Sequence, residues 1–157
     1  MAASTSALLS VNALVEAGGN MEAKGRNGET PLILAAAEDS SLMIFSLFNG
    51  GSGLETRGPG GMTALHVTGQ KNASSAASQL LMHGANIDAG DDKSRTPLHF
   101  CAISGSTEVA ELLLDGGAFI HAVTNMGVTA LQIAEVKSPE IANLIREQDL
   151  KAAQNKD

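Results

Sequence analysis

The sequence predicts an all-α protein, a solenoid of stacked helix–turn–helix units joined by β-turn or hairpin loops. A four-residue pattern that begins with threonine recurs every 33 residues along the 157-residue chain, at residues 30–33, 63–66, 96–99 and 129–132. Glycines that close apolar runs repeat with the same period, at Gly18, Gly51, Gly84 and Gly117. Internal similarity at such a period is typical of repeat architectures, in which each unit buries its apolar face against its neighbours.

The best-preserved unit shows why this spacing predicts a first helix. Its Thr96-Pro97 pair is a helix start, because the hydroxyl can cap free N–H groups and proline at the first helical position loses no hydrogen bond. Leu98, Cys101 and Ala102 then follow at i, i+3 and i+4, which makes one apolar stripe. One slot of this helix holds a small residue in every unit: Ala35, Thr68, Cys101 and Ala134. The helix can therefore lie close to its neighbours.

A second helix is predicted after the polar break at residues 105–107. The apolar run at residues 109–114 ends in Gly116-Gly117, and glycine is the usual residue of a left-handed C-terminal cap. The segment up to the next threonine is expected to form a hairpin-like turn. Two residues before the threonine, that turn carries a glycine in three units and Ser94 in the fourth: Gly28, Gly61 and Gly127 are the glycines.

The threonine pattern and the apolar run ending in glycine resemble the ankyrin repeat family over about residues 7–147. The resemblance implies an ankyrin-repeat solenoid, each unit being a β-turn followed by two antiparallel helices. We expect one array over residues 1–157. Its units are about 1–24 (partial), 25–57, 58–90, 91–123 and 124–157.

The two ends of the array depart from the pattern. The 33-residue frame places the first threonine before residue 1, so residues 1–3 are expected in a first helix and residues 8–15 in a second. The partial unit is either a degenerate cap or the start of a fragment cut from a longer protein, and the apolar Leu8, Leu9 and Val11 favour the fragment. At the other end, the polar residues 146–151 predict a terminal cap followed by a frayed tail.

Composition excludes several classes of protein. No apolar run approaches the roughly 20 residues that span a bilayer, and residues 1–24 do not resemble a signal peptide. The single cysteine excludes an internal disulfide and suits a reducing compartment, so we expect an intracellular location, cytoplasmic or nuclear. The net charge of −7 argues against general nucleic-acid binding.

No residues are expected to carry catalysis, to bind a cofactor or to hold a metal. His66 and His99 occupy the repeated histidine slot, where the family's histidine hydrogen-bonds to structure. Cys101 lies in the small-residue packing slot, which predicts a buried, inert thiol. The glycine clusters do not match a phosphate-binding loop, and no Gly-x-Ser-x-Gly nucleophile elbow is present.

Ankyrin-like arrays usually bind partners with the turn tips and the exposed side of each first helix. Transferred to this chain, those slots hold seven of the ten basic residues but only three of the seventeen acidic ones, so the predicted face carries about +4. The expected partner-binding residues are Lys24, Arg26, Glu29, Glu38, Arg57, Met62, Lys71, Asp92, Lys93, Arg95, Ile103, Met126, Val128 and Lys137.

The sequence therefore predicts a non-catalytic scaffold, a monomer or part of a longer chain, that binds a protein or peptide segment on its concave face. The excess of basic residues favours an acidic or phosphorylated partner, whereas nucleic acid and membrane insertion are not expected. The alternative is an architectural spacer or an autoinhibitory module within a larger multidomain protein. Fold alone does not decide between them.

Overall fold

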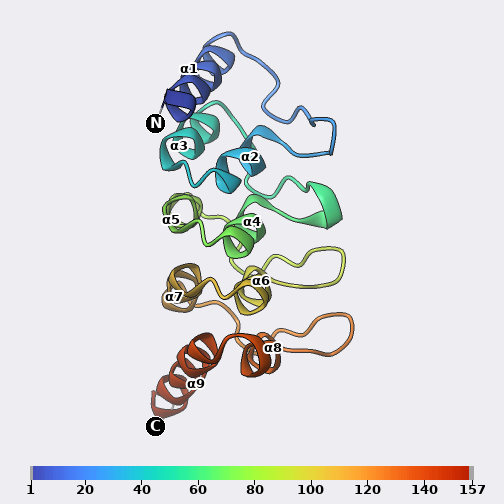
Figure 1. The fold of residues 1–157 in the computed structure, drawn as a ribbon, viewed down its shortest axis with the longest axis vertical. Coiled ribbons are helices and arrows are strands. Elements are labelled where there is room, and N and C mark those ends of the chain that lie inside the picture. Colours follow the sequence, from blue (N-terminus) through green and yellow to red (C-terminus); the bar gives the residue numbers. More distant parts are fainter. Residues whose placement is uncertain (1, 156–157) are drawn as a thin grey trace.

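The computed structural model describes residues 2–155, which form two parallel rows of helices stacked along one axis (Figure 1). The first row contains α2 (Pro31–Ala37), α4 (Ala64–Lys71), α6 (Pro97–Ser104) and α8 (Ala130–Lys137). The second row contains α1 (Ala2–Glu16), α3 (Ser41–Asn49), α5 (Ser74–Met82), α7 (Thr107–Asp115) and α9 (Pro139–Gln154).

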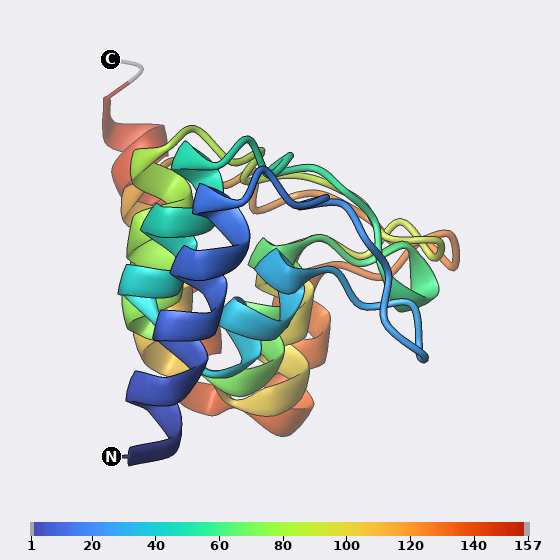
Figure 2. The same ribbon diagram turned by 90° about the horizontal axis from the view of Figure 1, so that it is seen from above.

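Loops that precede the first-row helices project to one side of the stack (Figure 2). We call them hairpins, and the third unit's hairpin includes a 3-10 turn at Pro59–Gly61. Within residues 2–155 the structure contains no named strand, only an isolated bridge between Val123 and Thr129. The prediction of an all-α solenoid of stacked helix–turn–helix units is confirmed. None of the helices in this part of the chain is long and apolar enough to cross a membrane.

Each first-row helix begins at the repeated threonine. Thr30 Oγ1 accepts a hydrogen bond from the Ile33 N–H at 3.3 Å, and Thr129 Oγ1 accepts one from Gln132 at 3.2 Å. In the two middle units the third helical residue is a histidine, which completes a reciprocal capping box with the threonine. The threonine pattern therefore acts as the predicted helix start.

The first four second-row helices end next to the repeated glycines, which adopt positive φ angles between 66° and 95°. Ser94, the one exception among the hairpin glycines, adopts the same left-handed conformation with a φ of 58°. The hairpin geometry thus persists although serine accepts this conformation less readily than glycine.

The core is a continuous layer of small and aliphatic side chains between the rows. The small slot predicted from the sequence (Ala35, Thr68, Cys101 and Ala134) is fully buried in every unit. Successive units are also joined by carboxylates at their hairpin bases. Glu22, Glu55 and Asp88 each accept a hydrogen bond from a backbone N–H 31 residues later, at 2.7–2.8 Å.

The N-terminal unit differs from the prediction. Instead of two short helices, residues 2–16 form the single helix α1, and Met1 lies outside the described residues. Three other units break between their helices at a residue with a positive φ angle, namely Asp39, Asn72 or Gly105, whereas no residue within the described range 2–16 adopts one. In the described chain α1 packs against α3 and not against α2. The flank of α2 that faces away from α4 therefore has no first-row neighbour.

The C-terminal unit also differs from the prediction, because α9 continues to Gln154 rather than fraying after residue 151. Two hydrogen bonds tie its C-terminal half to the array. Gln148 Nε2 donates to the Leu114 carbonyl at 3.2 Å, and the Arg146 guanidinium lies 2.6 Å from the Glu135 carboxylate. These contacts hold the helix on the last unit despite its polar sequence.

Candidate partner-binding face

The residues expected to contact a partner come from the hairpins and the first-row helices, and we call this side of the molecule the hairpin face. Most of these side chains are exposed: Lys24, Arg26, Glu38, Arg57, Lys71, Asp92, Lys93, Met126 and Lys137. The others are half-buried: Glu29, Met62, Arg95, Ile103 and Val128.

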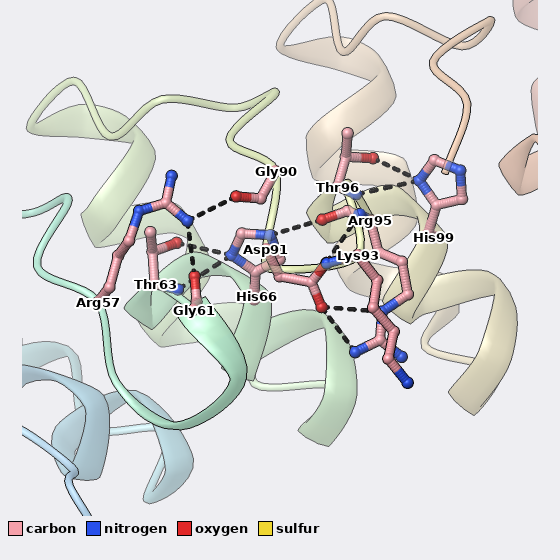
Figure 3. A network of polar contacts seen from close by, with 10 residues as sticks. All are labelled: Arg57, Gly61, Thr63, His66, Gly90, Asp91, Lys93, Arg95, Thr96 and His99. Carbon is pink, nitrogen blue, oxygen red and sulfur yellow. Dashed lines mark hydrogen bonds and ion pairs between the residues drawn. The ribbon is translucent and has the colours of Figure 1, made fainter. Parts of the chain in front are cut away.

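Neighbouring hairpins are bonded to one another, so the tips of the last three units form one connected edge. The Asp92 N–H donates to the Gly60 carbonyl at 3.1 Å, and one unit later the Asn125 N–H donates to the Lys93 carbonyl at 3.0 Å. Arg57 NH1 adds a bond of 2.7 Å to the Gly90 carbonyl (Figure 3). Residues 32 or 33 apart in sequence are therefore held side by side.

An ion pair between the half-buried Arg95 and the buried Asp91 stabilises the fourth unit's hairpin (Figure 3). The Arg95 guanidinium donates to the Asp91 carboxylate at 2.6 and 2.8 Å, and the backbone N–H groups of Lys93 and Arg95 donate to its other oxygen. Burial by itself would raise the pKa of Asp91, but the bonds from Arg95 and Lys93 outweigh it and the pKa is lowered. Arg95 also lies 4.4 Å over the ring of Phe100.

Arg57 also serves the fold, because its NH1 donates to the Gly61 carbonyl at 2.9 Å as well as to Gly90. Arg57 and Arg95 are thus tied to hairpin groups, and the sequence did not separate them from the other cations of the face. Five cationic side chains of the hairpin face make no hydrogen bond or ion pair within the described residues: Lys24, Arg26, Lys71, Lys93 and Lys137.

The two repeated histidines are structural, as predicted. The Thr63 N–H donates to His66 Nδ1 at 3.1 Å, so the ring's proton is on Nε2, which donates to the Arg95 carbonyl at 2.8 Å. His99 makes the equivalent pair of bonds, to Thr96 and to the Val128 carbonyl. Each ring therefore links a helix start to the next hairpin, and burial lowers the pKa of both histidines.

Cys101 is fully buried between neighbouring helices, and burial raises the pKa of its thiol to about 12. The thiol is therefore un-ionised at neutral pH, which agrees with the predicted packing role. Residues 2–155 contain no group of three or more His, Cys, Asp or Glu side chains arranged to hold a metal ion.

A hollow of about 320 Å³ lies on the hairpin face between α2 and α4. Three residues expected from the sequence line it, namely Glu29, Met62 and Lys71. Three further apolar residues line it and were not among the expected contacts, namely Ile33, Leu34 and Val67. The sequence contains one indication of this apolar site: the slot of Ile33 holds His66, His99 and Gln132 in the later units and is apolar only in α2.

Further apolar side chains of this face are exposed in the last unit. Met126, at the hairpin tip, is 83% exposed, and Val136, on α8, is 84% exposed. The outer side of the stack is different in character. There α5 and α7 present serines opposite three carboxylates, those of Glu108, Glu111 and Asp115.

Comparison with known families agrees with this geometry. The family model described as ankyrin repeats (3 copies) matches the chain over residues 1–91, 39–123 and 67–156. A search of curated proteins found no significant match.

Proposed function

Since the chain belongs to the ankyrin repeat family, whose repeats are generally protein–protein interaction modules, we propose that it is a non-catalytic scaffold for another protein. Its partner is an acidic segment, carrying carboxylate or phosphate groups, that lies along the hairpin face. Lys24, Arg26, Lys71, Lys93 and Lys137 supply the opposite charge.

Segregation of charge is the observation that carries this proposal. The protein has a net charge of −7, yet the hairpin face gathers five cations that have no partner in the described structure. A cation needed for the fold would be engaged as Arg57 and Arg95 are, by carbonyls or a carboxylate. Exposed charges of one sign mainly accelerate encounter with a partner of the other sign and set its orientation.

The experiment is a selection of random peptides on the immobilised protein, followed by measurement of affinity by fluorescence polarisation. We expect acidic peptides to dominate and their binding to weaken as salt rises. Lys93→Glu should weaken binding roughly fivefold or more, because it replaces attraction by repulsion at the edge of the face.

Lys151→Glu is the matched control. Lys151 is exposed on α9, outside the hairpin face, and undergoes the same change of charge. Equal losses from both variants, or selected peptides without acidic residues, would contradict the proposal. Failure to select any peptide would favour the architectural role instead.

A further inference from the structure

The hollow between α2 and α4 has an apolar floor and charged ends. Ile33 and Val67 form buried surface beneath it, and Leu34 on α2 contributes a wall that is 49% exposed. Two charged residues also line the hollow: Glu29 comes from the hairpin and Lys71 from the last turn of α4. Its volume of about 320 Å³ is near the lower limit for small-ligand pockets, so it suits one or two side chains.

The repeat itself explains why the hollow forms here. One unit later, the positions equivalent to Met62 and Val67 are Arg95 and Phe100, and the guanidinium lies 4.4 Å over the aromatic ring. The Arg95–Phe100 pair fills the corresponding space between α4 and α6, and Phe100 is only 5% exposed. Met62 and Val67 are smaller side chains without this stacking, and they leave the space between α2 and α4 unfilled.

The slot that holds Ile33 in α2 and His66 in α4 also makes the α2–α4 interface different from the later ones. His66 and His99 reach across to the carbonyl of the next hairpin, whereas Ile33 cannot donate such a bond. Instead Ile33 packs towards Gly58, where an added Cβ would lie 2.4 Å from its Cδ1 atom. The interface between α2 and α4 is therefore apolar where the following interfaces are polar.

We propose that this hollow anchors one large aliphatic side chain, such as leucine, of the acidic segment that binds the hairpin face. The inference rests on the proposed function. Lys71 has no partner in the described structure and receives an acidic residue next to the anchor. Glu29 repels acidic groups from the hairpin side, so the two charges orient the segment.

The test uses two fluorescein-labelled peptides of Asp, Glu, Gly and Ser that differ only in one central residue, leucine or serine. The wild-type protein should bind the leucine peptide roughly tenfold more tightly than the serine peptide, because burial of one leucine side chain strengthens binding by about that factor. In methyl-detected NMR, the leucine peptide should shift the signals of Ile33 and Val67, and the serine peptide should leave them in place.

The variant Met62→Arg with Val67→Phe fills the hollow with the pair that the next unit already accommodates. It should retain affinity for the serine peptide, helped by the added charge, and lose the preference for leucine. A second variant, Leu34→Ser, alters only a half-exposed wall residue and should reduce the preference without unfolding the protein.

The outcomes separate the two proposals. If both peptides bind equally well to the wild type, or if the filled variant still prefers leucine, the anchor is wrong and acidic binding stands. If neither peptide binds the wild type, the proposed function itself is contradicted. If the NMR signals that shift are only those of the Met126 and Val136 methyl groups, the apolar contact lies in the last unit and the proposed anchor is wrong.

Discussion

Acidification below about pH 6.5 should destabilise the fold through His66 and His99. Both rings are fully buried, and each Nδ1 accepts a backbone N–H bond that a protonated ring cannot accept. Burial lowers the pKa of both from the ordinary value of 6.5. The folded state therefore binds fewer protons than the unfolded state once the pH falls below 6.5.

The sign and size follow from this difference. The two neutral histidines make their full contribution to the free energy of unfolding above pH 6.5, and this contribution is lost as the pH falls from 6.5 towards their folded-state pKa. Each histidine can lower the free energy of unfolding by about 1.4 kcal/mol per pH unit in that window, and the two together by about 2.7 kcal/mol. Urea unfolding followed by circular dichroism, at several pH values from about 7.5 to 5, measures the slope.

The chain offers its own control. Gln132 occupies the histidine slot in the last unit, and its Oε1 accepts the Thr129 N–H at 2.9 Å. The double variant His66→Gln with His99→Gln should keep the cap, lose the bonds to the next hairpin and be less stable at every pH. Its stability should nevertheless vary much less between pH 6.5 and 5, because both histidines whose pKa is lowered by burial have been replaced. An unchanged slope in this variant, or a flat profile in the wild type, would refute the reasoning.

Two further predictions concern stability and use urea or thermal unfolding. Ser52→Ala should stabilise the protein by about 1 kcal/mol, because the Ser52 hydroxyl is buried without a partner in the described structure and Ala85 fills the same slot one unit later. A lower unfolding midpoint would contradict this. Gly69→Ala should destabilise by up to about 2 kcal/mol, although alanine favours helix, because the new Cβ would lie 2.8 Å from the Pro97 carbonyl oxygen. Ala36 occupies the same slot of α2 and is fully buried there, so a raised midpoint would mean that α4 and α6 accommodate the added methyl group as well.

Sequence alone was enough to predict the four first-row helices and the second-row helices α3, α5 and α7, with their starts and ends. The threonines, prolines and glycines act through hydrogen bonds and φ angles within a few residues, so their spacing suffices to place them. The sequence could likewise assign His66 and Cys101 to structural slots, because both recur at a fixed position in the period. Features that depend only on such local interactions can therefore be predicted from the repeat.

Other features depended on neighbours that the period does not reveal. The fusion of residues 2–16 into one helix left α2 without a first-row neighbour, and Leu34 became half-exposed where Phe100 is buried. The hollow beside it depends on how well the side chains of two units fill a shared space. Both are properties of pairs of units, and single positions do not predict them.

The availability of the charges was also decided by the tertiary structure. Arg95 and Lys93 are both basic hairpin residues, yet the first is held by Asp91 and Phe100 while the side chain of the second is unpaired in the described chain. Arg57 is occupied by a carbonyl 33 residues away in the next unit. The sequence predicted one common face for these cations. Only packing between units determined which of them are engaged by the fold, because a side chain's free donors depend on the acceptors that the neighbouring hairpin brings within reach.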